Sequence, residues 1–111
     1  MRLSYKKIFI GTAQFFSKYG ITNKNKNYSY KHFYKILEYA GKNSIFNYDT
    51  SSGYNSEKII GEFLTFNKIK NAKITTKITK IKTKNYKSFV ENSVSKSLKI
   101  LKSEIHTLFF H

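Results

Sequence analysis

The sequence predicts an α/β fold in which helices connect the strands of one parallel sheet. Two observations carry this prediction. Short runs rich in β-branched and aromatic residues alternate with segments whose apolar residues recur at helical spacing, and polar loops separate them. The resulting order β-α-β-α-β-α-β requires right-handed crossovers between parallel strands. The 111 residues include no Cys and no Pro, so we expect one domain without a disulfide framework.

The amino-terminal part of the chain predicts two strands and one helix. Residues 6–12 form a short apolar run with a glycine near its end, which is typical of a buried strand. After a long polar loop, residues 29–41 have the helical period, with Ser29 as the expected N-cap and Gly41 as the expected first residue beyond the helix. Residues 44–49 predict the second strand. The expected core face of the helix consists of Phe33, Ile36, Leu37 and Ala40.

The rest of the chain predicts two more helices and two more strands. Residues 56–66 predict a helix with Ser56 as its N-cap, and residues 73–78 predict a strand from their β-branched content. Residues 86–101 predict a third helix, and residues 106–111 predict a fourth strand. The expected inward-facing residues of these two helices are Ile59, Ile60, Phe63, Leu64, Val90, Val94, Leu98 and Leu101.

The net charge of +15 suggests a polyanion as a partner. Three features disfavour nucleic acid. Arg2 is the one arginine among 21 basic residues, although bidentate readout of bases and phosphates favours arginine. The lysines are also scattered along the chain, and the abundant Lys, Asn, Ile, Phe and Tyr share codons rich in A and T. An alternative function stays open, namely a non-enzymatic basic module that binds nucleic acid or other polyanions.

The sequence has no apolar run long enough for a membrane helix or for the hydrophobic part of a signal peptide. Together with the absence of cysteine, this favours a cytoplasmic protein without membrane contact. Because there is no Cys and no H-x-x-x-H or H-E-x-x-H spacing, we expect no metal site.

Four polar side chains stand at or just beyond the carboxyl ends of predicted strands, where parallel α/β folds collect their functional residues. They are Asp49, Tyr54, Lys77 and His111. A phenol has an ordinary pKa of about 10 and is a weak proton donor at neutral pH. A neighbouring ammonium favours the ionised phenol, a carboxylate holds the ammonium, and an imidazole can orient a carbonyl group. These residue types together suggest acid catalysis at a carbonyl oxygen.

Four motifs, in this order, resemble the amino-terminal part of the aldo-keto reductases. GTAQFFSKYGI (11–21) resembles the first strand and loop of one bacterial-type subgroup, and DTSSGYNSEKIIG (49–61) resembles the family signature with Tyr five residues after Asp. ITTKI (74–78) is similar to the strand that carries the family's lysine, and SLKILKSEIHTLFFH (97–111) resembles the helix and strand that end on its histidine. The resemblance covers essentially residues 1–111 and implies about the first four β/α units of a (β/α)8 TIM barrel.

The resemblance implies NADPH-dependent reduction of a small-molecule carbonyl, an aldehyde or ketone, to an alcohol. Tyr54 would be the general acid that protonates the carbonyl oxygen, Lys77 would make Tyr54 a stronger acid, and Asp49 would pair with Lys77. His111 would orient the substrate carbonyl. The residues implied on the nicotinamide side of the cofactor, which the family binds without a Rossmann glycine fingerprint, are Gly11, Thr12, Ala13 and Asp49.

A complete barrel of this kind needs about 250 residues. We therefore expect residues 1–111 to form an incomplete domain, a truncated fragment with little or no activity alone. The outer strands, 6–12 and 106–111, would leave apolar edges that a second copy of the chain or a separately encoded second half-barrel would cover. Where the family often has proline in its signature, this chain has Ser51 and Ser52, which predicts a less rigid Tyr54 loop.

Overall fold

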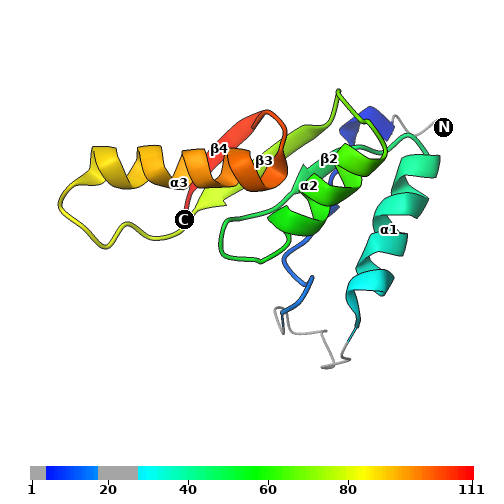
Figure 1. Ribbon diagram of the computed structural model, residues 1–111, viewed down its shortest axis with the longest axis horizontal. Coiled ribbons are helices and arrows are strands. Elements are labelled where there is room, and N and C mark those ends of the chain that lie inside the picture. The colour runs from blue at the N-terminus through cyan, green and yellow to red at the C-terminus, as the bar shows by residue number, and fades with distance from the viewer. Residues whose placement is uncertain (1–4, 18–27) are drawn as a thin grey trace.

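The computed structural model describes residues 5–17 and 28–111, so residues 18–27 of the expected polar loop lie outside the described residues. A short 3-10 helix, η1, precedes an alternation of strands and helices (Figure 1). This order confirms the predicted α/β class. The elements are η1 (Tyr5–Lys7), β1 (Ile10–Gly11), α1 (Tyr30–Lys42), β2 (Asn47–Asp49), α2 (Glu57–Phe66), β3 (Lys73–Ile78), α3 (Tyr86–Leu101) and β4 (Thr107–Phe110).

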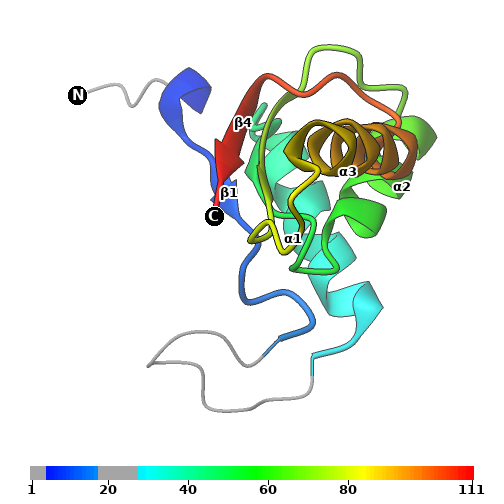
Figure 2. The same ribbon diagram turned by 90° about the vertical axis from the view of Figure 1, so that its left-hand side faces the viewer.

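The four strands form one parallel sheet in the order β1-β2-β3-β4, as predicted. Ile10 pairs with Tyr48, and Tyr48 pairs in turn with Ile74. All three helices lie on one side of the sheet (Figure 2). In the described part of the chain the other side carries no α-helix, and Phe9 and Phe109 are 40% and 53% exposed. The helix layer therefore covers one face of the sheet and leaves the second face open.

β1 is much shorter than the strand predicted for residues 6–12, because only its last part pairs with β2 and η1 occupies the beginning. The side-chain amide of Asn47 explains the difference. Its Nδ2 donates to the carbonyl oxygens of Lys6 at 3.1 Å and Ile8 at 2.9 Å. These side-chain bonds take the place of the backbone hydrogen bonds that would have paired a longer β1 with β2. The second strand is also shorter than predicted, since Ser44 adopts a left-handed turn conformation with φ of 59°.

α1 begins as predicted and ends later than predicted. The Ser29 hydroxyl accepts a hydrogen bond from the first turn and caps the helix. Gly41 lies inside the helix, which ends at the C-cap residue Asn43. Gly41 packs closely against the core, because a Cβ at this position would lie 3.2 Å from the ring of Phe46 and 3.3 Å from the ring of Phe63. The glycine thus marks a helix–core contact and does not terminate the helix.

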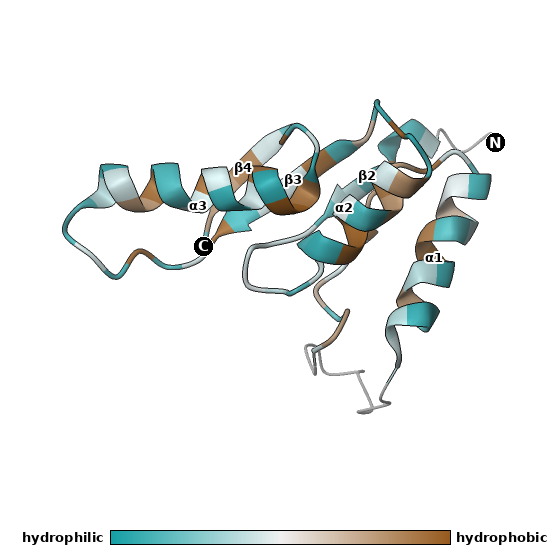
Figure 3. Ribbon diagram, in the orientation of Figure 1, coloured by the Kyte–Doolittle hydropathy of each residue, from teal (hydrophilic) through white to brown (hydrophobic). Residues whose placement is uncertain are grey.

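The core lies between the helices and the sheet, and hydrophobic and hydrophilic residues alternate along the helices (Figure 3). The prediction that Ile36 and Leu98 belong to the core is wrong, because Ile36 is 36% exposed and Leu98 is 40% exposed. α3 turns Ser97 inward instead, because Val90, Val94 and Ser97 lie on one helical stripe. The buried cluster consists of Phe15, Phe33, Leu37, Tyr48, Ile59, Ile60, Phe63, Leu64, Ile74 and Leu101.

Tyr48 is completely buried in this core, and its hydroxyl has no hydrogen-bond partner among the described residues. Burial raises the pKa of Tyr48 well above its usual value. We expect Tyr48→Phe to leave the free energy of unfolding unchanged or to raise it by about 1 kcal/mol, because it removes an unsatisfied polar atom. Urea unfolding at neutral pH measures this change. A loss of more than about 2 kcal/mol would show that the hydroxyl is bonded in solution.

The raised pKa of Tyr48 also gives this substitution a pH dependence. The folded state favours the neutral phenol, so the contribution is fully present below about pH 10, the ordinary pKa, and is lost as the pH rises further. Wild-type protein should therefore lose stability above about pH 10 more steeply than Tyr48→Phe. Tyr39→Phe, at a position that is 74% exposed, is the matched control and should follow the wild type.

Candidate active site

The four predicted catalytic residues lie together at the edge of the sheet that is formed by the carboxyl ends of its strands. Asp49 ends β2, Lys77 is the penultimate residue of β3, and His111 follows β4. Tyr54 lies in the loop between β2 and α2. The His111 N–H donates to the Ile78 carbonyl at 3.0 Å, which extends the pairing of β4 by one residue. The C label in Figure 1 marks this edge, beside the end of β3.

Lys77 is at the centre of the group. Its Nζ forms an ion pair with Asp49 Oδ1 and donates to the Thr50 carbonyl oxygen at 3.0 Å. The same Nζ lies 5.3 Å from the centroid of the Tyr54 ring. The rings of Tyr54 and His111 meet edge to face, with centroids 6.4 Å apart. The structure therefore brings the carboxylate, ammonium, phenol and imidazole together.

The exposure of these groups suits proton donation. The Lys77 side chain is 18% exposed, whereas that of Asp49 is 46% exposed. A partly buried cation is screened less by water and salt than a surface lysine, so its field at a neighbouring phenol is stronger. Oxygens of Asp49 and Thr50 compensate for the burial of the ammonium. A phenol placed beside this charge, with an imidazole next to it, can donate a proton to a carbonyl oxygen.

A buried cluster of three hydroxyl groups fixes the backbone next to Asp49. The hydroxyl oxygens of Thr12 and Thr50 each lie 2.8 Å from Ser56 Oγ, and all three residues are completely buried. The Thr12 hydroxyl also donates to the Asp49 carbonyl at 2.9 Å. Ser56 is the N-cap residue, as predicted, but its hydroxyl makes no capping bond because it serves this cluster. Isolated Ser and Thr residues carry no sequence signal that could have revealed it.

Of the residues implied for cofactor contact, Gly11, Thr12 and Ala13 lie at the carboxyl end of β1, and Asp49 ends the neighbouring strand β2. Gly11 is paired with Asp49, and a Cβ at Gly11 would meet no atom within 4 Å. There is thus open space over Gly11, beside the carboxylate. Thr12 is fully buried with its hydroxyl bonded inward, so its side chain does not face this space. Ala13, the next residue, is half-buried.

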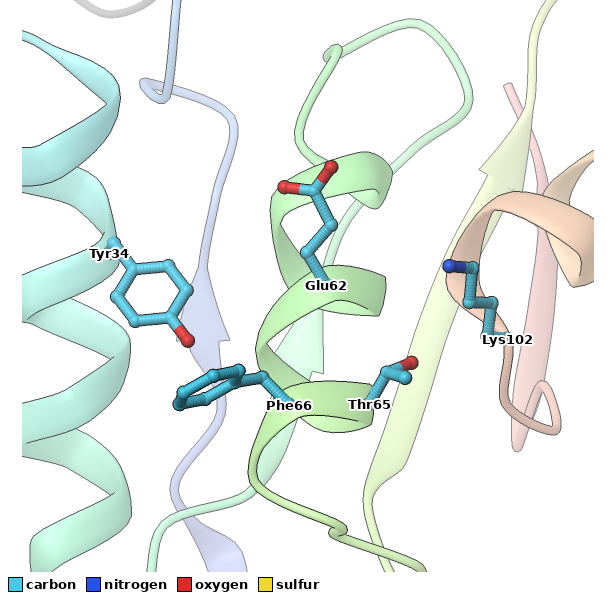
Figure 4. Close-up of a pocket in the computed structure, with 5 residues that line it drawn as sticks. All are labelled: Tyr34, Glu62, Thr65, Phe66 and Lys102. Carbon is cyan, nitrogen blue, oxygen red and sulfur yellow. The ribbon is translucent and has the colours of Figure 1, made fainter.

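A separate pocket of about 380 Å³ lies in the helix layer. In Figure 4 the ring of Tyr34 on α1 points towards Phe66 on α2, and Lys102 stands on the far side. Beside it, Tyr30 donates to Glu62, and burial together with this bond raises the pKa of Tyr30 to about 12. None of the four predicted catalytic residues lines this pocket. It is therefore distinct from the edge of the sheet described above.

The sequence predicted neither a metal site nor a membrane-spanning helix. In residues 5–17 and 28–111, no three His, Cys, Asp or Glu side chains are arranged to hold a metal ion. Within the same ranges, no helix combines the length and the apolar character that crossing a bilayer requires.

The chain is similar to two solved reductases. The first, from Pseudomonas aeruginosa, is assigned as an aldo-keto reductase; it superimposes with a TM-score of 0.72 at 22% identity, over 92% of this chain and 41% of that chain. The second is assigned as 2,5-diketo-D-gluconic acid reductase B, with a TM-score of 0.60 at 28% identity, over 75% of this chain and 30% of that chain. This chain thus spans less than half of either. No curated protein matches it.

The structural likeness shows that the four-stranded sheet has the fold of the amino-terminal part of a reductase TIM barrel. A sequence model of the aldo/keto reductase family matches residues 7–111, which is nearly the whole chain. The chain therefore belongs to the aldo/keto reductase family.

Proposed function

We propose that this chain provides the proton-donating part of an NADPH-dependent reductase that converts an aldehyde or ketone into an alcohol. Family membership supports oxidoreductase chemistry in general. The observation that carries the finer proposal is the position of Lys77, whose Nζ pairs with Asp49 and lies 5.3 Å from the centroid of the Tyr54 ring. The carbonyl substrate, the choice of NADPH and the residue roles below all belong to this proposal.

Each of the four side chains has a separate task. The Tyr54 hydroxyl donates its proton to the carbonyl oxygen, and the Lys77 charge stabilises the phenolate that remains. Asp49 and the Thr50 carbonyl hold the ammonium in place. His111, whose ring adjoins that of Tyr54, donates a hydrogen bond that turns the carbonyl oxygen towards the phenol. A proton from solvent restores the phenol after the alcohol leaves.

The nicotinamide, when bound, supplies the hydride for the carbonyl carbon. The described residues fit the ring end of such a cofactor, because the space over Gly11 is open and lies beside Asp49. The main chain of Thr12 and Ala13 would continue this surface, since the Thr12 hydroxyl is bonded inward. The sequence has no G-x-G-x-x-G motif for a pyrophosphate. The remaining cofactor contacts are therefore assigned to other parts of a complete barrel.

The test compares the chain alone with a fusion to the part of the Pseudomonas aeruginosa protein that lies beyond the aligned region, since the chain covers 41% of that protein. Fluorescence titration measures NADPH binding, and absorbance follows NADPH oxidation in the presence of aldehydes. We expect binding and equimolar alcohol formation in the fusion, and little of either in the chain alone. A folded fusion that binds NADPH and reduces no carbonyl compound would overturn the proposal.

Asp49→Asn is expected to lower the rate of carbonyl reduction roughly 10- to 100-fold, because the Lys77 ammonium loses its charged partner and shifts. The rate is measured in the fusion at saturating NADPH. Glu91→Gln is the matched control, since it neutralises an exposed carboxylate that lies 4.0 Å from Lys87 on α3. That variant should keep the wild-type rate. An equal loss in both variants would mean that overall charge, and not the Lys77 pair, determines the rate.

A further inference from the structure

Several hydrogen bonds connect the turn between β2 and α2 to β3, and three of them are accepted by the carbonyl group of Lys77. The Ser52 N–H donates to this oxygen at 3.1 Å, the Ser52 hydroxyl donates at 3.1 Å, and the Ser51 hydroxyl donates at 3.2 Å. The Thr50 N–H bonds to the Thr75 carbonyl at 2.8 Å, so the two N–H bonds continue the β2–β3 ladder beyond the end of β2. The two serine hydroxyls add donors that an ordinary ladder lacks.

Lys77 also holds the turn from its side chain. While its carbonyl accepts from Ser51 and Ser52, its Nζ donates to the Thr50 carbonyl at 3.0 Å. The same lysine is therefore bonded to three successive residues of the turn, in both directions. Any displacement of the turn relative to β3 breaks several of these bonds together.

Ser51, which is bonded to Lys77, is also hydrogen-bonded to the residues at and just before Tyr54. The Ser51 hydroxyl also accepts from the Gly53 N–H at 3.3 Å, and the Tyr54 N–H donates to the Ser51 carbonyl at 3.0 Å. Ser51 is 1% exposed, so water competes little for the hydrogen bonds of its hydroxyl. Ser52 is exposed, so water can compete for the bonds of that hydroxyl. The buried hydroxyl of Ser51 is thus the stronger of the two connections between Lys77 and the tyrosine.

We propose that Ser51 and Ser52 are positioning residues that hold the Tyr54 phenol next to the Lys77 ammonium. The absence of proline from this turn predicted a less rigid loop, and these hydroxyl bonds supply an anchor in its place. The effect on catalysis depends on the proposed role of Tyr54 as proton donor. The effect on the distance between Tyr54 and Lys77 does not depend on that role, and it can be measured in a protein that has no enzymatic activity.

The geometric test uses nuclear Overhauser effects between the ε-methylene protons of Lys77 and the ring protons of Tyr54 in the isotopically labelled chain. Wild-type protein should show this contact, since Lys77 Nζ lies 5.3 Å from the ring centroid. Ser51→Ala should weaken it several-fold and Ser52→Ala should weaken it less. Ser97→Ala removes a hydroxyl from a serine on α3 that is 4% exposed, and it should leave the contact intact. A merely structural role would lower stability without separating Lys77 from Tyr54.

The catalytic test measures kcat and KM in the fusion described above. Ser51→Ala should lower kcat about tenfold while the KM of the carbonyl substrate changes little, because the proton donor is displaced and the substrate is still bound. An unchanged Lys77–Tyr54 contact in a folded Ser51→Ala chain overturns the proposal, whether or not the wild type is a reductase. If Ser51→Ala fails to fold, the Lys77–Tyr54 contact is measured in Ser52→Ala, at the exposed position. Ser52→Thr, which keeps the hydroxyl, is its control. An equally strong contact in these two variants then overturns the proposal.

Discussion

Tyr54→Phe should lower the kcat of carbonyl reduction by about 10²- to 10⁴-fold, the usual contribution of a positioned general acid. The substitution removes the hydroxyl proposed to donate the proton and leaves the ring beside Lys77 and His111. NADPH binding should not change, because in the proposed mechanism the phenol hydroxyl serves the carbonyl oxygen and not the cofactor. Alcohol formation and NADPH fluorescence, measured on the same fusion, separate the two effects.

Tyr86→Phe is the matched control for this experiment. Tyr86 is the first residue of α3 and is 63% exposed, so the same atom is removed far from any buried contact. It should keep the wild-type kcat. If Tyr54→Phe retained more than about a tenth of the wild-type rate, a group other than Tyr54 would have to supply the proton.

Gly61→Ala should have the largest effect on stability, a loss of about 2 kcal/mol in the free energy of unfolding. Gly61 lies within α2 where this helix meets the end of α3. A Cβ at Gly61 would lie far inside van der Waals distance of the Ile100 carbonyl oxygen and 3.0 Å from the Leu101 Cα. These are backbone atoms, so α3 would have to move. The better helix propensity of alanine, worth about 1 kcal/mol, offsets only part of this cost.

Urea unfolding followed by circular dichroism measures the loss at Gly61. Gly41→Ala provides the comparison, because its Cβ would meet the rings of Phe46 and Phe63 at 3.2 and 3.3 Å. Rings can turn by a few tenths of an ångström, so this variant should change stability by less than about 1 kcal/mol. Equal losses at the two glycines would show that α2 and α3 do not approach as closely in solution.

Much of the fold could be predicted from local pattern. The helical period of residues 56–66 and the β-branched content of residues 73–78 predict α2 and β3 with nearly the observed bounds. The errors occur where a long-range contact decides. The Asn47 amide binds the carbonyls of Lys6 and Ile8, 41 and 39 residues away, and shortens β1. No local pattern near residue 8 reports that bond.

The candidate site shows the same division. Their places at the carboxyl ends of predicted strands, and then the resemblance in motif order, identified Asp49, Tyr54, Lys77 and His111 as candidates, and their catalytic roles stay predictions. The hydrogen bonds that support these candidates were not predicted. Thr12, Thr50 and Ser56 form a hydroxyl cluster across 44 residues of sequence, and Ser51 bonds to a carbonyl 26 residues away.

The amino-acid sequence by itself determined the class of fold and the candidate site residues, because hydrophobic period and motif spacing are local properties of the chain. Only the tertiary structure decided where β1 begins, that Ser56 serves a buried cluster, and that Lys77 stands between Asp49 and the Tyr54 ring. Those outcomes depend on distances between residues far apart in sequence. Such distances exist only after the helices pack on the sheet and bring the strand ends together.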